Sequence, residues 1–241
     1  ECGVSSELKL LLNEIEIDTQ YLITEPKRIS SKKTRIIAAQ QQVVRYDRES
    51  INEISELSQK TLLLNFRKRI ADYDCVLLSD YGKGVLTSDL TQQLINVAKQ
   101  HSIKILVDPK GVNYSKYKGA YLLTPNKKEA SEATGININD DASLACSIKK
   151  LKEECELDVS LITLSEQGVT IYDGELRNHP TQTREIFDVT GAGDTVLASL
   201  GFALSCELDI DEAVKFANLA AGVVVGKIGS STATLNEIIE Y

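Results

Sequence analysis

The 241-residue sequence has no methionine, no tryptophan and only two histidines, and its five cysteines form no CxxC pair. Scattered cysteines of odd number predict reduced thiols and argue against a disulfide framework or a zinc site. His101 and His179 are too few for a histidine-rich metal centre or a Ser-His-Asp triad. No apolar run reaches the roughly 18 residues that span a bilayer, and no secretory signal is visible. We therefore expect a cytoplasmic protein.

The charge balance is acidic, with a net charge of −8 and a pI of about 5.0. Such a balance excludes broad electrostatic attraction to nucleic acid or to an anionic membrane. An anionic substrate would therefore need a local basic pocket. The composition is that of one globular domain. The sequence starts at Glu1 without an initiator, and a chain of this length would ordinarily contain roughly five methionines. We expect it to be a piece of a longer protein.

Short apolar runs alternate with helical patterns from Asp74 onwards, which predicts an α/β fold with a mainly parallel sheet covered on both faces. Asp173-Gly174 predicts the turn of a β-hairpin. Before Asp74 we expect a helix, one or two strands and a second helix, whose Arg67-Lys68-Arg69 run would be a solvated face. The predicted strands are 75–79, 103–107, 120–124, 159–163, 169–172 and 177–179, with extended chain at 17–23 and 33–47. The predicted helices are 5–15, 51–71, 88–101, 142–155, 195–204 and 211–225, and a further helix opens near residue 129.

Polar side chains follow the predicted parallel strands, and ligands of such sheets bind beyond the carboxyl ends of the strands. Each also has a structural interpretation: an aspartate can cap a helix, a lysine can be an exposed loop residue and an asparagine can form a turn. Together they predict a pocket for a phosphorylated ligand. These residues are Asp80, Lys83, Asp108, Lys110, Asn126, Glu129 and Ser165.

The stretch 185–200 contains a glycine turn, Gly191-Ala192-Gly193, followed by Asp194 and a run of small apolar residues. Glycines let backbone amides converge on an anion, and the start of a helix adds further free amides. A carboxylate beside a phosphate pocket is expected where it accepts the proton of an attacking hydroxyl. The alternative is an ordinary turn in which Asp194 caps the helix.

The run Asp188-Val-Thr-Gly-Ala-Gly-Asp194-Thr resembles the C-terminal signature of the ribokinase-like (PfkB) sugar kinases, and Asn126-Lys-Lys-Glu129 resembles their Asn-x-x-Glu motif. The resemblance implies a three-layer α/β/α sandwich with a small β lid, and ATP and Mg²⁺ as cosubstrates. One partial kinase domain would then cover residues 1–241, with part of the lid at about 19–47.

The same resemblance implies roles for individual residues. Asp194 would be the catalytic base, and the amides of Gly191, Ala192 and Gly193 would form the anion hole. Asn126 and Glu129 would place Mg²⁺, with Glu129 acting through water. The residues implied to bind ATP are Asn126, Lys127, Lys128, Glu129, Ser165, Gly168 and Asn218. Weaker candidates for the sugar phosphate are Arg45, Lys83 and Lys110.

Further phrases, including Leu78-Ser-Asp-Tyr-Gly-Lys-Gly84 and Val107-Asp-Pro-Lys-Gly111, resemble the heptose 7-phosphate kinases of this family. That resemblance implies phosphorylation of D-glycero-D-manno-heptose 7-phosphate at C1, in ADP-heptose synthesis for the lipopolysaccharide core. It also implies a homodimer, and an adenylyltransferase domain fused to the kinase domain in the full-length protein.

The sequence departs from the family pattern at its start, where the Asp-bearing strand and the Gly-Gly-x-x-Asn segment that hold the sugar are missing. Two alternatives therefore stand beside the heptose kinase. The chain could phosphorylate another phosphosugar, or it could be a nucleotide-binding fragment that does not turn over. An upstream continuation into such a strand would favour the enzyme.

Overall fold

The computed structural model describes residues 3–38, 41–181 and 187–241. Its contacts divide the chain into two compact units, one made of residues 1–69 and 82–90 and the other of residues 70–81 and 91–241. The prediction of one partial kinase domain with a lid segment at about 19–47 stays a prediction. No helix within the described ranges is long and apolar enough to cross a membrane.

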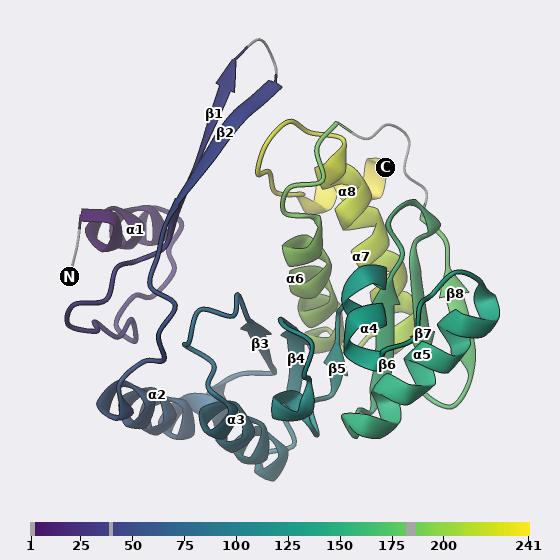
Figure 1. The fold of residues 1–241 in the computed structure, drawn as a ribbon, viewed down its shortest axis with the longest axis horizontal. Coiled ribbons are helices and arrows are strands. Elements are labelled where there is room, and N and C mark those ends of the chain that lie inside the picture. The colour runs from purple at the N-terminus through teal and green to yellow at the C-terminus, as the bar shows by residue number, and fades with distance from the viewer. Residues whose placement is uncertain (1–2, 39–40, 182–186) are drawn as a thin grey trace. The chain divides into compact units, whose positions relative to one another are not determined.

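The larger unit is built on a six-stranded sheet in the order β3-β4-β5-β6-β7-β8 (Figure 1). The pairs from β3 to β6 are parallel, whereas β7 and β8 pair antiparallel, so the predicted mainly parallel sheet and the hairpin are both confirmed. The strand β5 is shorter than expected. The strands are β3 (Cys75–Ser79), β4 (Lys104–Asp108), β5 (Leu122–Leu123), β6 (Val159–Thr163), β7 (Val169–Tyr172) and β8 (Leu176–His179).

Helices cover the sheet on both faces. Leu106, Leu122 and Leu161 of the sheet pack in one buried cluster with α6 and α7, whereas α4 and α5 contact β6 on the other face (Figure 1). Buried side chains on both faces explain why these strands appear as continuous apolar runs. The helices are α3 (Ser88–Gln100), α4 (Lys127–Thr134), α5 (Asp141–Glu154), α6 (Ala192–Ser205), α7 (Ile210–Val225) and α8 (Leu235–Glu240), with short 3₁₀ turns at Ile70–Asp72, Ser115–Tyr117 and Ser165–Gln167.

The smaller unit contains α1 (Gly3–Glu14), the antiparallel pair β1 (Lys32–Ala38) and β2 (Gln41–Arg48), and α2 (Glu56–Arg69). The predicted helices and strands are present, although α2 begins later than residue 51. The prediction that Arg67-Lys68-Arg69 forms a solvated face was wrong for Arg69. The Arg69 guanidinium donates to the Tyr21 hydroxyl at 2.7 Å and lies 5.2 Å from the centre of its ring, so this arginine is held by an aromatic side chain.

Candidate active site

The glycine turn leads directly into α6. Gly191 is the residue before the helix and has φ = +84°, a conformation that favours glycine. The Thr195 amide donates to the Gly191 carbonyl at 2.9 Å, and the Ala192 amide donates to Val189 at 3.2 Å. Among the hydrogen bonds of the described residues, none uses the amides of Gly191 or Gly193. These two amides are therefore available to an anion, whereas Ala192 would first have to leave Val189.

The alternative that Asp194 caps this helix is wrong. The helix has no side-chain cap, and the hydrogen bonds described for the Asp194 carboxylate run to the Tyr81 hydroxyl, at 3.3 and 3.5 Å. Asp194 lies in the first turn of α6 and is exposed. Its carboxylate is thus free of the helix backbone and can accept a proton from a ligand. Residues 185 and 186 of the predicted stretch lie outside the described residues.

Asp188 secures the loop that precedes α6. One carboxylate oxygen accepts from the Thr190 amide at 2.9 Å, and the other accepts from the Gly229 amide at 3.2 Å. The segment that follows α7 is therefore tied to the glycine turn. The two ends of the predicted signature have different environments, because the Asp188 carboxylate accepts hydrogen bonds from backbone amides while Asp194 is exposed.

Asp108, at the end of β4, lies near two other carboxylates. Burial, together with the negative charges of Glu129 and Asp194, raises the pKa of Asp108 to about 6. Lys110 offsets part of this charge, because its ammonium donates to Glu129 at 2.9 Å, and this hydrogen bond raises the pKa of Lys110. The ends of β4 and β5 and the start of α6 therefore bring the carboxylates of Asp108, Glu129 and Asp194 near one another, with Lys110 beside Glu129. The sequence predicted polar residues at these strand ends, and the pocket for a phosphorylated ligand that it inferred from them stays a prediction.

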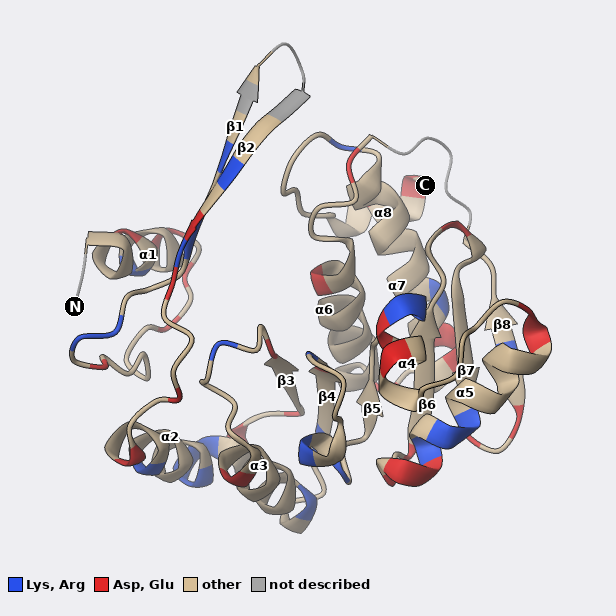
Figure 2. Cartoon of the chain, in the orientation of Figure 1, with Lys and Arg blue, Asp and Glu red and all other residues tan. Residues whose placement is uncertain are grey.

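Asn126 and Glu129 form the capping box of α4. The Glu129 amide donates to the Asn126 side chain at 3.0 Å, and the Asn126 amide donates to the Glu129 carboxylate at 3.1 Å. Both side chains remain in part accessible. Lys127 and Lys128 are exposed in the same turn, and Lys128 lies 3.8 Å from Glu132. Figure 2 shows the mixture of basic and acidic residues on α4.

Ser165, Gly168 and Asn218 lie around the ends of β6 and β8. The side-chain amide of Asn218 donates to the His179 carbonyl at 2.9 Å, and a Cβ on Gly168 would clash with the same oxygen. Gly168 therefore has a structural reason to be glycine. Ser165 is exposed, with φ = +53°. The structure brings these residues to the carboxyl edge of the sheet, and their contact with a nucleotide stays a prediction.

Two of the predicted sugar-phosphate residues belong to the smaller unit. There Arg45 lies 3.1 Å from Asp47, and Lys83 pairs with Glu49. Each basic group thus has an acidic partner within its own unit. Only Lys110 of the three is in the larger unit with Asp194.

The sequence interpretation did not single out Tyr81 or Tyr117, and it treated Asp80 only as a polar strand end. Asp80 is 5% exposed, and its carboxylate accepts from the Tyr117 hydroxyl at 2.7 Å and from Lys116 at 2.5 Å. The Tyr117 hydroxyl in turn accepts from the Lys110 amide at 3.0 Å. An aspartate directly after an apolar strand was the available signal, whereas its partners are far along the chain.

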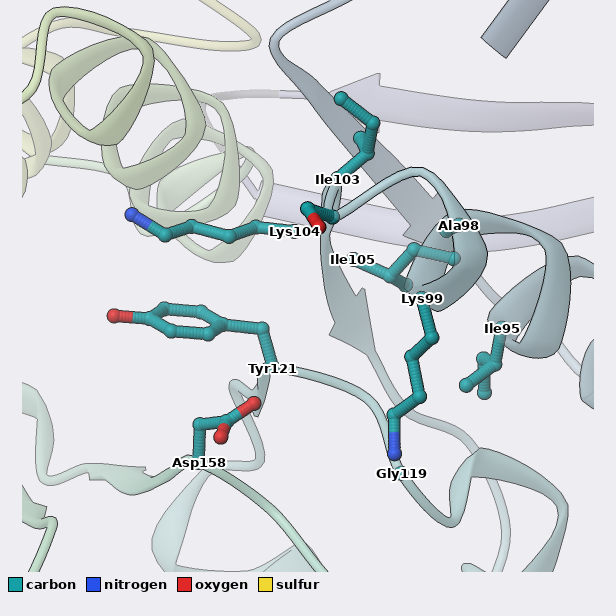
Figure 3. Close-up of a pocket in the computed structure, with 10 residues that line it drawn as sticks. Ile95, Ala98, Lys99, Ile103, Lys104, Ile105, Gly119, Tyr121 and Asp158 are labelled. Atoms are coloured by element: carbon teal, nitrogen blue, oxygen red, sulfur yellow. The ribbon is translucent and has the colours of Figure 1, made fainter. Parts of the chain in front are cut away.

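A separate pocket of about 190 Å³ lies at the opposite edge of the sheet, near the starts of β4, β5 and β6 (Figure 3). The Lys104 ammonium lies 5.1 Å from the centre of the Tyr121 ring, and Lys99 points toward Gly119. Because ligands of parallel sheets bind at the carboxyl ends of the strands, this pocket is distinct from the Asp194 site.

Residues 4–237 match the pfkB family of carbohydrate kinases. The chain is 62% identical over 239 residues to the bifunctional protein HldE of Aliarcobacter butzleri, covering 99% of this chain and 50% of that protein. It is 56% identical to bifunctional HldE of Sulfurimonas denitrificans, covering 98% of this chain and 49% of that one. The chain therefore spans about half the length of these curated relatives.

The fold is also that of solved kinases. Phosphofructokinase-2 of Escherichia coli superposes with a TM-score of 0.81 at 16% identity, over 99% of this chain and 78% of that one. Ribokinase of Giardia lamblia superposes with a TM-score of 0.80 at 21% identity, over 100% of this chain and 79% of that one. At these identities the likeness concerns the fold alone. From the family match and the high identity to the HldE proteins, we conclude that the chain belongs to the pfkB family of carbohydrate kinases.

Proposed function

We propose that the chain is a sugar kinase domain that transfers the γ-phosphate of ATP to the C1 hydroxyl of D-glycero-D-manno-heptose 7-phosphate. The product would be the 1,7-bisphosphate, a precursor of ADP-heptose for the lipopolysaccharide core. The observation that carries the proposal is the exposed Asp194 carboxylate, which does not cap its own helix. It directly follows Gly193, whose amide takes part in none of the hydrogen bonds of the described residues. The choice of sugar is supported by the motif resemblance and by the identity to the bifunctional HldE proteins.

Asp194 would take the proton of the attacking hydroxyl, since a carboxylate without a hydrogen bond to its own helix can face the substrate. The amides of Gly191 and Gly193, at the positive end of the α6 dipole, would stabilise charge on the transferred phosphoryl group. Ala192 would contribute only after its amide leaves Val189. The nucleotide would extend along the strand ends towards Ser165, Gly168 and Asn218, with Lys127 and Lys128 near its phosphates.

The acidic residues suit Mg²⁺ carried with the nucleotide. Burial, and after it the negative charges of Glu129 and Asp194, raise the pKa of Asp108 to about 6, and a bound cation would offset the part that comes from these charges. In the described part of the chain, no three His, Cys, Asp or Glu side chains are grouped so that they could hold a metal ion by themselves. This agrees with an ion held largely by phosphate and water. Asn126 and Glu129 would orient it, and Mg²⁺ would offset charge on the phosphates.

Lys110 is the stronger candidate for an anionic substrate group, because it belongs to the same unit as Asp194. Its bond to Glu129 would have to weaken when a phosphate binds. Arg45 and Lys83 would reach the 7-phosphate only by leaving Asp47 and Glu49. We also propose that the full-length protein carries an adenylyltransferase domain and forms a homodimer, which gel filtration with light scattering would test.

The test is ADP release by the full-length protein with a panel of phosphosugars. We expect heptose 7-phosphate to give the highest kcat/KM. Turnover of a different phosphosugar would instead favour the other kinase, and nucleotide binding without any turnover would favour the non-catalytic fragment.

Replacing the proposed base gives the sharpest prediction. Asp194→Asn should lower kcat by about 10³ or more, because the proton acceptor is lost while the shape is kept. ATP binding should be nearly unchanged. Asp89→Asn is a matched control, because Asp89 is also exposed in the first turn of a helix, α3. Near wild-type turnover of Asp194→Asn would contradict the role of this residue.

A further inference from the structure

Tyr81 contacts Asp194 across a long stretch of sequence. Its hydroxyl lies 3.3 and 3.5 Å from the two carboxylate oxygens, and it reaches them from the loop that follows β3. The Tyr81 side chain is 51% exposed. Burial alone therefore does not explain why this ring lies beside the start of α6. A hydroxyl that donates to a carboxylate does explain it.

The main chain before Tyr81 is held firmly. The buried Asp80 carboxylate accepts from Tyr117 and Lys116, and the Asp80 amide donates to the Asp108 carbonyl at 3.0 Å. Removing one partner of such a buried charged group is costly, so the end of β3 has little freedom. Tyr81 is consequently presented from a fixed point of the sheet.

The Asp194 carboxylate requires a hydrogen-bond donor from outside α6 to hold it in one orientation. This carboxylate is exposed and takes no hydrogen bond from the amides of α6 among the described residues. An aspartate side chain of this kind rotates among several conformations. The carboxylates of Asp108 and Glu129 add repulsive charge nearby, since Glu129 and Asp194 both act on the pKa of Asp108. The Tyr81 hydroxyl supplies the hydrogen bond that selects one orientation.

We propose that Tyr81 is a positioning residue, which holds the Asp194 carboxylate in the orientation that accepts the proton of the substrate hydroxyl. The inference rests on the proposed role of Asp194 as the base. Each carboxylate oxygen accepts more than one hydrogen bond, so Tyr81 binds one side and the sugar hydroxyl binds the other. The O–H bond of the sugar breaks, its proton passes to Asp194, the sugar oxygen bonds the γ-phosphorus, and the bond from phosphorus to the ADP oxygen breaks.

Tyr81 itself remains a donor throughout. Burial first, and then the charge of Asp194, raises its pKa, and Asp108 acts in the same direction. The phenol is therefore protonated near neutral pH and does not compete with Asp194 for the substrate proton.

The kinetic test uses Tyr81→Phe in the full-length protein with ATP and heptose 7-phosphate. Loss of one hydrogen bond to a charged group predicts a fall in kcat of about tenfold, with the KM for ATP unchanged. In the Asp194→Asn background the same substitution should cause no further loss, because the residue acts through Asp194. Tyr73→Phe is the control, since Tyr73 is 49% exposed in the same unit. An additive loss would overturn the proposal.

A second measurement does not depend on turnover. The difference in tyrosinate absorbance between the wild-type protein and Tyr81→Phe follows the titration of Tyr81. In the Asp194→Asn background this titration should move to lower pH, because a neighbouring negative charge is gone while Asp108 remains. An unchanged titration would overturn the contact.

The two measurements separate the two proposals. If Asp194→Asn keeps its turnover, the proposed function of Asp194 fails whatever the titration shows. If Asp194→Asn is inactive, Tyr81→Phe has wild-type kinetics and the Tyr81 titration does not move in the Asp194→Asn background, only the positioning role of Tyr81 fails.

Discussion

At the scale of single residues, Asp108 shows how the site's charge affects stability. Its pKa is raised to about 6 in the folded chain, because it is partly buried and near Glu129 and Asp194. An unfolded aspartate has a pKa of about 4. The folded state therefore keeps the proton to higher pH. Stability from this group is present below about pH 4 and is lost as the pH rises towards 6.

Asp108→Asn should remove that loss. Two pKa units correspond to about 2.7 kcal/mol, and solvent screening of a partly exposed group reduces this to about 1–2 kcal/mol. The variant should therefore gain stability relative to wild type between about pH 4 and 7.5. Urea unfolding of the wild-type protein and the variant at about pH 4 and at about pH 7.5 measures the gain. Glu153→Gln, an exposed change on α5, is the control. An equal difference at both pH values would contradict the shifted titration.

A substitution at Gly193 tests the proposed anion hole without disturbing the fold. This glycine has no positive φ, and a Cβ on this residue would meet no atom within 4 Å. Gly193→Ala should therefore keep or slightly raise stability, by up to about 1 kcal/mol. The methyl group would occupy the space proposed for phosphate, so we expect the KM for ATP to rise about tenfold or more.

Gly3→Ala is the matched control for that substitution, because Gly3 also lies in the first turn of a helix and its Cβ would be equally unobstructed. Its kinetics should equal those of the wild type. Unchanged kinetics of Gly193→Ala, at unchanged stability, would show that no ligand approaches this turn.

At the scale of elements, α4 and α5 each begin with a capping box. Asn126 with Glu129 caps α4, and Asp140 with Ser143 caps α5. Only the first of these capping boxes is next to Lys110. Comparing substitutions in the two capping boxes therefore distinguishes a residue that only caps its helix from one that also binds a ligand.

Asn126→Ala and Asp140→Ala should both lower the midpoint of thermal unfolding, because each removes a capping bond. Only Asn126→Ala should raise the Mg²⁺ concentration needed for half-maximal turnover. A Mg²⁺ titration of both variants measures this. If the two curves coincide with that of the wild type, Asn126 is a cap and nothing more.

At the scale of the whole molecule, the chain carries a net charge of −8, and a nucleotide must bind in spite of it. The free amides at α6 and the lysines near α4 are the local features that could offset this charge. Ligand binding to the folded state alone raises its stability by mass action.

Mg·ATP at about 100 times its Kd should stabilise the protein by about 2.7 kcal/mol. Asp194→Asn should show the same thermal shift, since this residue is proposed to act in proton transfer only. Inorganic phosphate at the same concentration is the control and should have little effect. A wild-type protein whose unfolding midpoint does not move with Mg·ATP would contradict the proposed nucleotide site.

Much of the fold, and the glycine turn of the candidate site, could be predicted from local sequence patterns. Apolar runs of strand length predicted β3, β4 and β6, and Asp173-Gly174 predicted the β7–β8 hairpin. The helix α8 was not predicted, because six residues are too few to show a clear period. The glycine turn before α6 was recognised because φ > 0 and close backbone approach require glycine there.

The sequence alone determined the alternation of strands and helices, the family signature around Asp194 and the acidic balance of the chain, since each depends on residues close together or on composition. Only the tertiary structure decided that Asp194 does not cap its helix and that Tyr81 contacts it. It also decided that Asp80 is buried against Tyr117. These contacts join distant parts of the chain, and they depend on how parallel strands align and which strand ends become neighbours. Local spacing carries no record of that alignment.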